Sequence, residues 1–235
     1  MASGEEKRLA YLEAMGVGVW VGRGEGSAGA PPGEPSRDAP ALDLSVSDVD
    51  SLDWEALRAR VLACDRCELH KQRTQAVFGV GDRAARWLVI GEAPGADEDR
   101  QGEPFVGRAG KLLNNMLLAI GLKREQVYIT NIVKCRPPGN REPAAEEAQS
   151  CAPYLARQIA LIKPKLILAV GRVAAQNLLK SDRPVGTMRG KRFFYDETEI
   201  PIVVTYHPAY LLRSPQEKRK AWQDLLFAKE TFSSL

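Results

Sequence analysis

Residues 88–110 read LVIGEAPGADEDRQGEPFVGRAG, and this stretch determines the fold that we expect. Its first residues complete an apolar run of the kind that forms a buried strand. Glycines and prolines from position 91 onward then predict a loop, which carries four acids. Phe105 follows, and an amphipathic helix after it is expected to stop at Gly121. Ligands of open α/β sheets bind beyond the carboxyl ends of the strands, so this loop is a candidate site, with a solvated acidic turn as the alternative.

The chain beyond this stretch alternates apolar strands with helices. Strands are expected over residues 87–91, 126–133, 166–170 and 200–206. Helices are expected over residues 53–63, 143–162 and 172–180, and from a capping box at 214–217 to about 232, with a basic loop or hairpin over 183–195. This order predicts an α/β fold of three layers, αβα, around a four-stranded parallel sheet. The carboxyl ends of parallel strands share one rim, so Glu92, Asn131, Gly171 and His207 should converge there.

The N-terminal part of the chain differs in composition from the rest. Residues 5–15 predict a short amphipathic helix within an N-terminal helical extension, residues 1–21. Residues 22–50 include a segment rich in Gly, Pro and Ala, and we expect a flexible linker. Residues 51–235 are the expected globular domain. Residues 54–235 carry 29 Lys and Arg against 20 Asp and Glu, a weak indication of a polyanionic partner.

Four cysteines form a candidate metal site: Cys64, Cys67, Cys135 and Cys151. A C-x2-C pair is a common chelate for zinc or an iron–sulfur cluster. We see no secretion signal, so metal ligation is favoured over disulfides. Spacing and chemistry alone favour structural zinc, with an iron–sulfur cluster as the second interpretation and four unrelated buried thiols as the third.

Two polar residues lie at strand ends where each invites a functional interpretation. Asn131 occurs in YITNIVKC, where every neighbour suits a strand, and asparagine is disfavoured there unless its amide has a role. Local bonding to the backbone is the alternative interpretation. His207 occurs in YHPAYLLR, and Pro208 fixes the backbone after it. A lone histidine at a strand end is more often structural than catalytic, so His207 alone is weak evidence.

Three stretches occur in order with the four cysteines: GEAPGADEDRQGEPFVGRAGKLL, YITNIVKCRPPGNREP and YHPAYLLR. Together they resemble the family 4 uracil-DNA glycosylases, the iron–sulfur branch of the uracil-DNA glycosylase superfamily. The resemblance runs from about residue 54 to the C-terminus. It implies the uracil-DNA glycosylase-like fold and a [4Fe–4S] cluster on Cys64, Cys67, Cys135 and Cys151 in place of zinc. It also implies hydrolysis of the glycosidic bond of uracil in DNA, which leaves an abasic site.

The resemblance assigns the recognition of the base. Phe105 would stack on the flipped ring. Asn131 would select uracil, because its amide oxygen accepts from N3–H and its NH2 donates to O4, whereas cytosine reverses both groups. Glu98 would stand beside C5, where a thymine methyl would clash.

The resemblance also assigns the bond-breaking step. His207 would stabilise negative charge developing on O2. Ala93 stands where other members of the superfamily often have Asp or Asn, so the catalytic water is expected to be held by Glu92 or by Asn140. The segment after the second strand has no histidine and no insert, so turnover is expected rather than a covalent bond to DNA.

The DNA contacts are expected from the second half of the chain. Leu211, four residues after His207, would wedge into the gap left by the base. Phosphate contacts are expected from these residues, with a solvated basic face as the alternative: Arg136, Arg189, Lys191, Arg192 and Arg213. Two other functions remain open: an iron–sulfur-stabilised DNA-binding protein without turnover, and a glycosylase for deaminated purines. We expect a monomer of the bacterial cytoplasm, associated with the nucleoid and not with a membrane, whose N-terminal tail is a candidate site for an unidentified partner.

Overall fold

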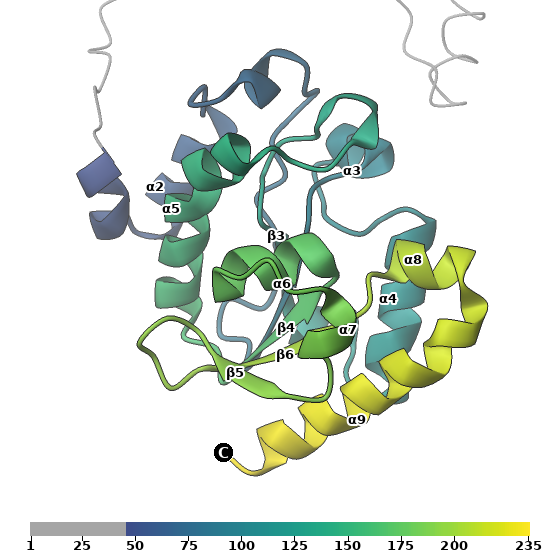
Figure 1. Ribbon diagram of the computed structural model, residues 1–235. Helices are drawn as coiled ribbons and strands as arrows, with labels where there is room; N and C mark the ends of the chain where they lie inside the picture. The colour runs from purple at the N-terminus through teal and green to yellow at the C-terminus, as the bar shows by residue number, and fades with distance from the viewer. Residues whose placement is uncertain (1–45) are drawn as a thin grey trace, which may run out of the picture. The chain divides into compact units, whose positions relative to one another are not determined.

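The computed structural model describes residues 46–235, and the predictions for residues 1–21 and for most of the linker lie outside them. Figure 1 shows a central sheet with helices packed around it. The strands are β1 (Val80–Gly81), β2 (Trp87–Gly91), β3 (Tyr128–Asn131), β4 (Leu166–Val170), β5 (Arg192–Phe194) and β6 (Pro201–Thr205). Their spatial order is β1-β3-β2-β4-β6-β5. The predicted α/β class is confirmed, and the sheet has six strands instead of four.

The four predicted strands form the parallel centre of the sheet. β2 pairs in parallel with β3 and β4, and β4 pairs in parallel with β6. The two additional strands are short and pair antiparallel at the edges, β1 with β3 and β5 with β6. β5 lies in the basic segment over 183–195, where a loop or hairpin was expected.

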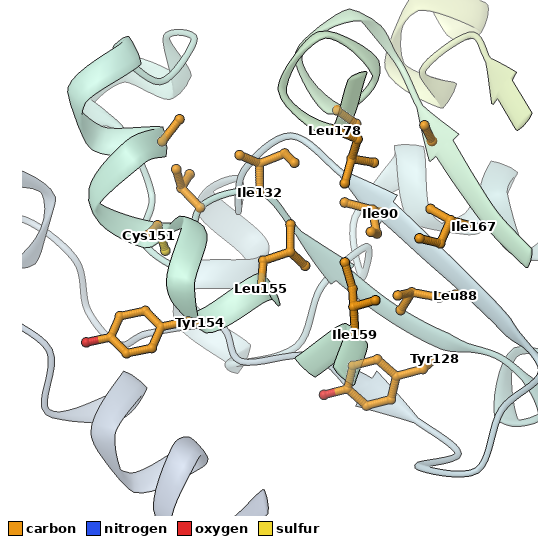
Figure 2. Packing of buried hydrophobic residues seen from close by; sticks show 14 of the residues in the cluster. Leu88, Ile90, Tyr128, Ile132, Cys151, Tyr154, Leu155, Ile159, Ile167 and Leu178 are labelled. Atoms are coloured by element: carbon orange, nitrogen blue, oxygen red, sulfur yellow. The ribbon is translucent and has the colours of Figure 1, made fainter. Parts of the chain in front are cut away.

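Both faces of the sheet are covered. The α-helices are α2 (Trp54–Leu62), α3 (Ala96–Gln101), α4 (Arg108–Ala119), α5 (Ala145–Ile162), α6 (Arg172–Leu179), α7 (Val185–Met188), α8 (Pro208–Arg213) and α9 (Lys218–Ser233). Leu88 and Ile90 of β2 pack toward α5, as Figure 2 shows, in a cluster that also contains residues of α2 and α6. Val89, from the opposite face of the same strand, joins a cluster formed with α4 and α9. Every residue of the central strands is buried, because helices cover both faces of the sheet. The predicted three-layer arrangement is therefore confirmed.

Short 3₁₀ turns connect these elements: η1 (Val46–Ser51), η2 (Glu68–Lys71), η3 (Arg124–Gln126), η4 (Pro138–Asn140) and η5 (Pro215–Glu217). Most of η1 lies within the expected linker, but Val49 is 1% exposed and Arg157 Nε donates to Leu52 O at 2.6 Å. The ordered domain therefore extends N-terminal to the expected boundary at residue 51. No helix in the part of the chain that the structure describes is both long and apolar enough to cross a membrane.

One local prediction was wrong, and one was incomplete. Ser214 makes no capping hydrogen bond, and the expected capping box is instead the η5 turn that precedes α9. The acidic loop contains the short helix α3, whose Asp99 is 2% exposed and accepts from Thr74 N at 2.9 and 3.1 Å. This carboxylate holds a neighbouring loop, so the segment is not merely a solvated acidic turn.

Candidate active site

A cavity of about 500 Å³ opens at the carboxyl ends of the parallel strands. It brings together most of the predicted site residues: Glu92, Ala93, Glu98, Phe105, Asn131, Asn140, His207 and Arg213. Arg141, Glu142 and Tyr210 also line it and were not predicted. A larger groove of about 790 Å³, lined mainly by α5 and α6, contains none of the predicted residues. The smaller cavity is therefore the candidate active site.

Asn131 ends β3 with its side chain buried at the inner wall of the cavity. The residue is 2% exposed, and its Oδ1 has no hydrogen-bond partner among residues 46–235. Gly91 pairs with it across β2 and β3, and a Cβ at Gly91 would lie 2.5 Å from both Asn131 Oδ1 and Phe105 Cζ. Only glycine leaves room for this approach. An unpaired buried acceptor is unfavourable by about 1–3 kcal/mol, so the geometry suits a ligand that donates a hydrogen bond.

Phe105 is held in an unusual backbone conformation. Its φ of 55° is in the left-handed region, which a non-glycine residue adopts only when its surroundings impose it. Glu98 Oε1 accepts from Val106 N at 2.9 Å and from Gly107 N at 3.1 Å. On the other side of the turn, Arg124 donates to Pro104 O at 2.5 Å and to Phe105 O at 3.3 Å. These contacts fix the ring against the cavity.

Glu98 has a structural task in addition to its expected place beside the base. Its second oxygen, Oε2, accepts from Gly95 N at 3.1 Å, so one carboxylate joins both ends of the loop. Arg124 was not predicted, because it lies on η3, about 20 residues after the loop, and no motif marks it. Burial lowers the pKa of its guanidinium, and an arginine side chain stays charged at neutral pH.

His207 is the N-cap of α8 and presents a neutral ring to the cavity. Its Nδ1 accepts from Ala209 N at 3.1 Å, which places the ring proton of a neutral imidazole on Nε2. Burial, with a smaller contribution from the charge of Arg213, lowers the pKa of His207 to about 4. The ring of Phe105 lies 5.6 Å from the imidazole at an interplanar angle of 31°. At neutral pH His207 is therefore an uncharged hydrogen-bond donor.

Glu92 and Asn140, the two candidates for holding water, differ in their surroundings. Burial raises the pKa of Glu92, and Glu142 raises it further while Arg172 opposes this. Glu142 itself forms an ion pair with Arg172. Asn140 is exposed, and its Oδ1 accepts from Arg136 Nε at 2.8 Å. Ala93 lines the cavity without a polar side chain. Glu92 is thus the more buried of the two polar groups.

Two expected DNA contacts have structural positions instead. Leu211 is 1% exposed and belongs to the cluster between the sheet, α4 and α9, so it cannot wedge into DNA from this position. Its neighbour Tyr210 is 36% exposed and lines the cavity. Arg189 donates to both oxygens of Asp224, at 2.7 and 2.8 Å, with its side chain 12% exposed. This ion pair joins α9 to the segment after α7 and leaves Arg189 poorly placed for phosphate.

The other basic candidates remain available. Arg213 lines the cavity, and Arg136 lies beside it through its bond to Asn140. Lys191 and Arg192 are exposed at the edge strand β5, and neither lines the cavity. The structure therefore gathers only part of the predicted basic surface at the site.

Cys64 and Cys67 lie in the turn between α2 and η2, Cys135 lies in the segment after β3, and Cys151 lies in α5. All four are free thiols. Burial is the main cause that raises the pKa of Cys67, Cys135 and Cys151, the last to about 12, and charge on neighbouring cysteines contributes in the same direction. Arg73 Nη1 donates to Cys135 Sγ at 2.8 Å. Among residues 46–235, no group of three or more His, Cys, Asp or Glu side chains is arranged so that it could hold a metal ion.

Comparison with known proteins places this architecture in a family. The model of the uracil DNA glycosylase superfamily matches residues 78–226. A type-4 uracil-DNA glycosylase of Archaeoglobus fulgidus is 45% identical over 170 residues, which are 70% of this chain and 85% of that protein. One of Sulfurisphaera tokodaii is 43% identical over 189 residues, 77% of this chain and 85% of that protein. A type-5 uracil-DNA glycosylase of Pyrobaculum aerophilum is 31% identical over 146 residues, 56% of this chain and 64% of that protein. The chain belongs to the uracil-DNA glycosylase superfamily, and these relatives associate it with the type-4 branch.

Proposed function

We propose that this protein is a DNA repair glycosylase that hydrolyses the N-glycosidic bond of uracil in DNA and leaves an abasic site. The observation that carries the proposal is the buried, unpartnered Oδ1 of Asn131 beside the ring of Phe105. Uracil offers an N3–H to that acceptor and an O4 to the amide NH2. Cytosine offers an acceptor at N3 and a donor at C4, so it would leave buried polar atoms unpaired.

The reaction follows from the residues around the base. The nucleotide leaves the duplex stack, and Phe105 supplies a face for the ring. As the bond between C1′ and N1 breaks, its electron pair moves onto the uracil ring, and the Nε2–H of His207 stabilises the charge on O2. Water attacks C1′, and Glu92 is placed to orient that water or to take its proton, with Asn140 as the alternative. We propose that Glu98 stands beside C5 of the base, and the same carboxylate fixes the loop.

DNA binding is proposed through the basic groups near the cavity. Arg213 and Arg136 are the candidates closest to the site, and Lys191 with Arg192 would extend the contact along β5. We propose that Tyr210, which is exposed on α8 and lines the cavity, occupies the space that a flipped base leaves in the duplex. Binding through phosphates should weaken steeply with salt, because the counterions of the DNA are released.

A gel assay on uracil-containing DNA tests the function. The expected result is an alkali-labile abasic site at uracil and none at cytosine in a matched strand. DNA binding without strand breakage after alkali would favour the alternative of a DNA-binding protein without turnover. A strand with hypoxanthine in the same assay tests the excision of deaminated purines.

We also propose that Cys64, Cys67, Cys135 and Cys151 hold a [4Fe–4S] cluster. The four thiols are free, and charge on Cys64 acts on Cys67, Cys135 and Cys151, so the four lie near one another; thiolate is the ligand that such clusters require. The cluster would have a structural role when bound: it would join the end of α2 to the segment after β3 and to α5.

The cluster proposal predicts a coloured protein. The purified chain should be brown, with broad absorbance near 400 nm and about four iron atoms per chain. Cys135→Ser should lose iron and solubility before its residual soluble fraction loses the ability to cleave uracil DNA, because the site is structural. Iron and zinc analysis by mass spectrometry provides the measurement. A colourless, zinc-loaded and fully active preparation would contradict the assignment.

The boundary of the domain gives a second prediction, which compares two truncations. Removal of residues 1–45 should leave the excision rate and the Tm unchanged. Removal of residues 1–52 also deletes Val49, which is 1% exposed, and the Leu52 carbonyl that Arg157 binds. Loss of the buried valine alone costs about 2 kcal/mol, which corresponds to a Tm lower by roughly 4–8 °C. Equal Tm values for the two truncations would contradict the role of η1.

A further inference from the structure

Lys134 is a buried ammonium whose three donors are all used. The residue is 1% exposed. Its Nζ donates to Thr130 Oγ1 at 2.6 Å, to Gln158 Oε1 at 2.7 Å and to the backbone carbonyl of Asn131 at 2.8 Å. None of these partners is a carboxylate. Burying a charged amine in this way is unfavourable unless every donor is satisfied, so the three acceptors must be held in place.

The acceptors are themselves anchored to other elements. Gln158 Nε2, on α5, donates to Phe78 O at 2.9 Å, and Thr130 Oγ1 donates to the same carbonyl at 3.0 Å. The carbonyl of Lys134 accepts from Val77 N at 2.7 Å. The ammonium is thus the centre of a rigid polar network between β3, α5 and the loop before β1.

The same residue lies beside the cysteine group. Lys134 directly precedes Cys135 in the chain, and the charge of its ammonium interacts with Cys151 and Cys135. Cys151 lies on α5 and belongs to the cluster of buried residues that Figure 2 shows. Thiolates of a bound cluster would supply the negative charge that the ammonium does not find among its hydrogen-bond partners.

We propose that Lys134 is a positioning residue that fixes the backbone of Asn131 and so aims the amide that selects the base. The inference rests on the proposed uracil chemistry and assigns a function to a group outside the cavity. Asn131 Oδ1 has no partner of its own within the described chain, so its direction depends on how firmly the backbone behind it is held. Through Lys134, the cysteine group and base recognition become parts of one network.

Two variants and one control test this role. Lys134→Met keeps an unbranched side chain and removes all three donors. Gln158→Met is milder, because it removes one acceptor of Nζ from a different element and does not touch Asn131. Ile159→Ala, at the next position of α5 and 2% exposed, makes a cavity without removing a polar group. The probes are two DNA strands, one with 2′-fluoro-2′-deoxyuridine, which resists cleavage, and one with a tetrahydrofuran abasic analogue.

Lys134→Met should weaken binding of the fluorouridine strand by roughly tenfold, the value of about one hydrogen bond, and leave binding of the abasic strand unchanged. Gln158→Met should act in the same direction with a smaller effect, and Ile159→Ala should change neither affinity, with all measurements made below each Tm. If Lys134→Met and Gln158→Met both keep the wild-type preference for the fluorouridine strand, this inference is wrong and the proposed function still stands. A wild-type chain that binds both strands equally would overturn the proposed function and this inference together.

Discussion

Replacing Asn131 with aspartate is expected to reduce the rate of uracil excision by roughly 10⁴-fold, the size of effect seen when a built polar pocket meets the wrong partner. Aspartate keeps the volume of the side chain but replaces the NH2 donor with a second acceptor. O4 of uracil would then face a carboxylate in a pocket where the residue is 2% exposed, with no water to separate the two oxygens.

The same substitution should change which base is accepted. If burial keeps the new carboxyl protonated, its O–H donates to N3 of cytosine and its carbonyl accepts from the C4 amine, so cytosine becomes a weak substrate. Single-turnover rates on matched uracil and cytosine strands provide the measurement. Asn115→Asp, the same change at an exposed position of α4, is the control for charge. Unchanged uracil excision in Asn131→Asp would show that Asn131 does not read the base.

Positions that depend on strand patterns could be predicted from the sequence. The four central strands are continuous apolar runs, because each is covered on both faces, and such runs are recognisable without knowledge of the fold. Parallel pairing then puts the residues after each strand on one rim, which is why Glu92, Asn131 and His207 line one cavity, while Gly171, also expected there, lies against His207 and does not line it. The edge strands β1 and β5 are two and three residues long and carry no comparable signal.

Positions that depend on side-chain packing could not be predicted. Leu211 was expected to face DNA because of its spacing from His207, but the α8 helix turns position 211 toward the core and position 210 outward. Arg189 was expected to be free, but its partner Asp224 lies 35 residues further along the chain. Arg124 and Lys134 hold Phe105 and Asn131 through their backbone carbonyls. Every residue has such a carbonyl, so the sequence does not indicate which one is contacted.

Replacing His207 with alanine is expected to slow uracil excision by roughly 10²–10³-fold, the usual loss when one donor to a developing oxyanion is removed. The order of preference among bases should stay unchanged, because O2 is common to uracil, thymine and cytosine. His207→Gln should recover part of the rate, because an amide N–H can replace the neutral Nε2–H. A change in base preference on loss of His207 would contradict its assignment to charge stabilisation.

The pH dependence separates a neutral donor from an imidazolium. The pKa of His207 is lowered to about 4 from 6.5, so the ring is neutral above that value, and the wild-type rate should not fall between pH 6 and pH 8. An imidazolium would instead lose its proton as the pH rises through that range.

The acid range tests Glu92. Burial raises the pKa of Glu92 above its ordinary 4.5, so as the pH falls Glu92 should be protonated before His207 is. The rate should therefore fall on the acid side in wild type and in His207→Ala alike, and Glu92→Gln should abolish that dependence. A wild-type rate that declines above pH 6 would show that the imidazole acts as a charged group, and loss of the acid limb in His207→Ala would assign that limb to His207 in place of Glu92.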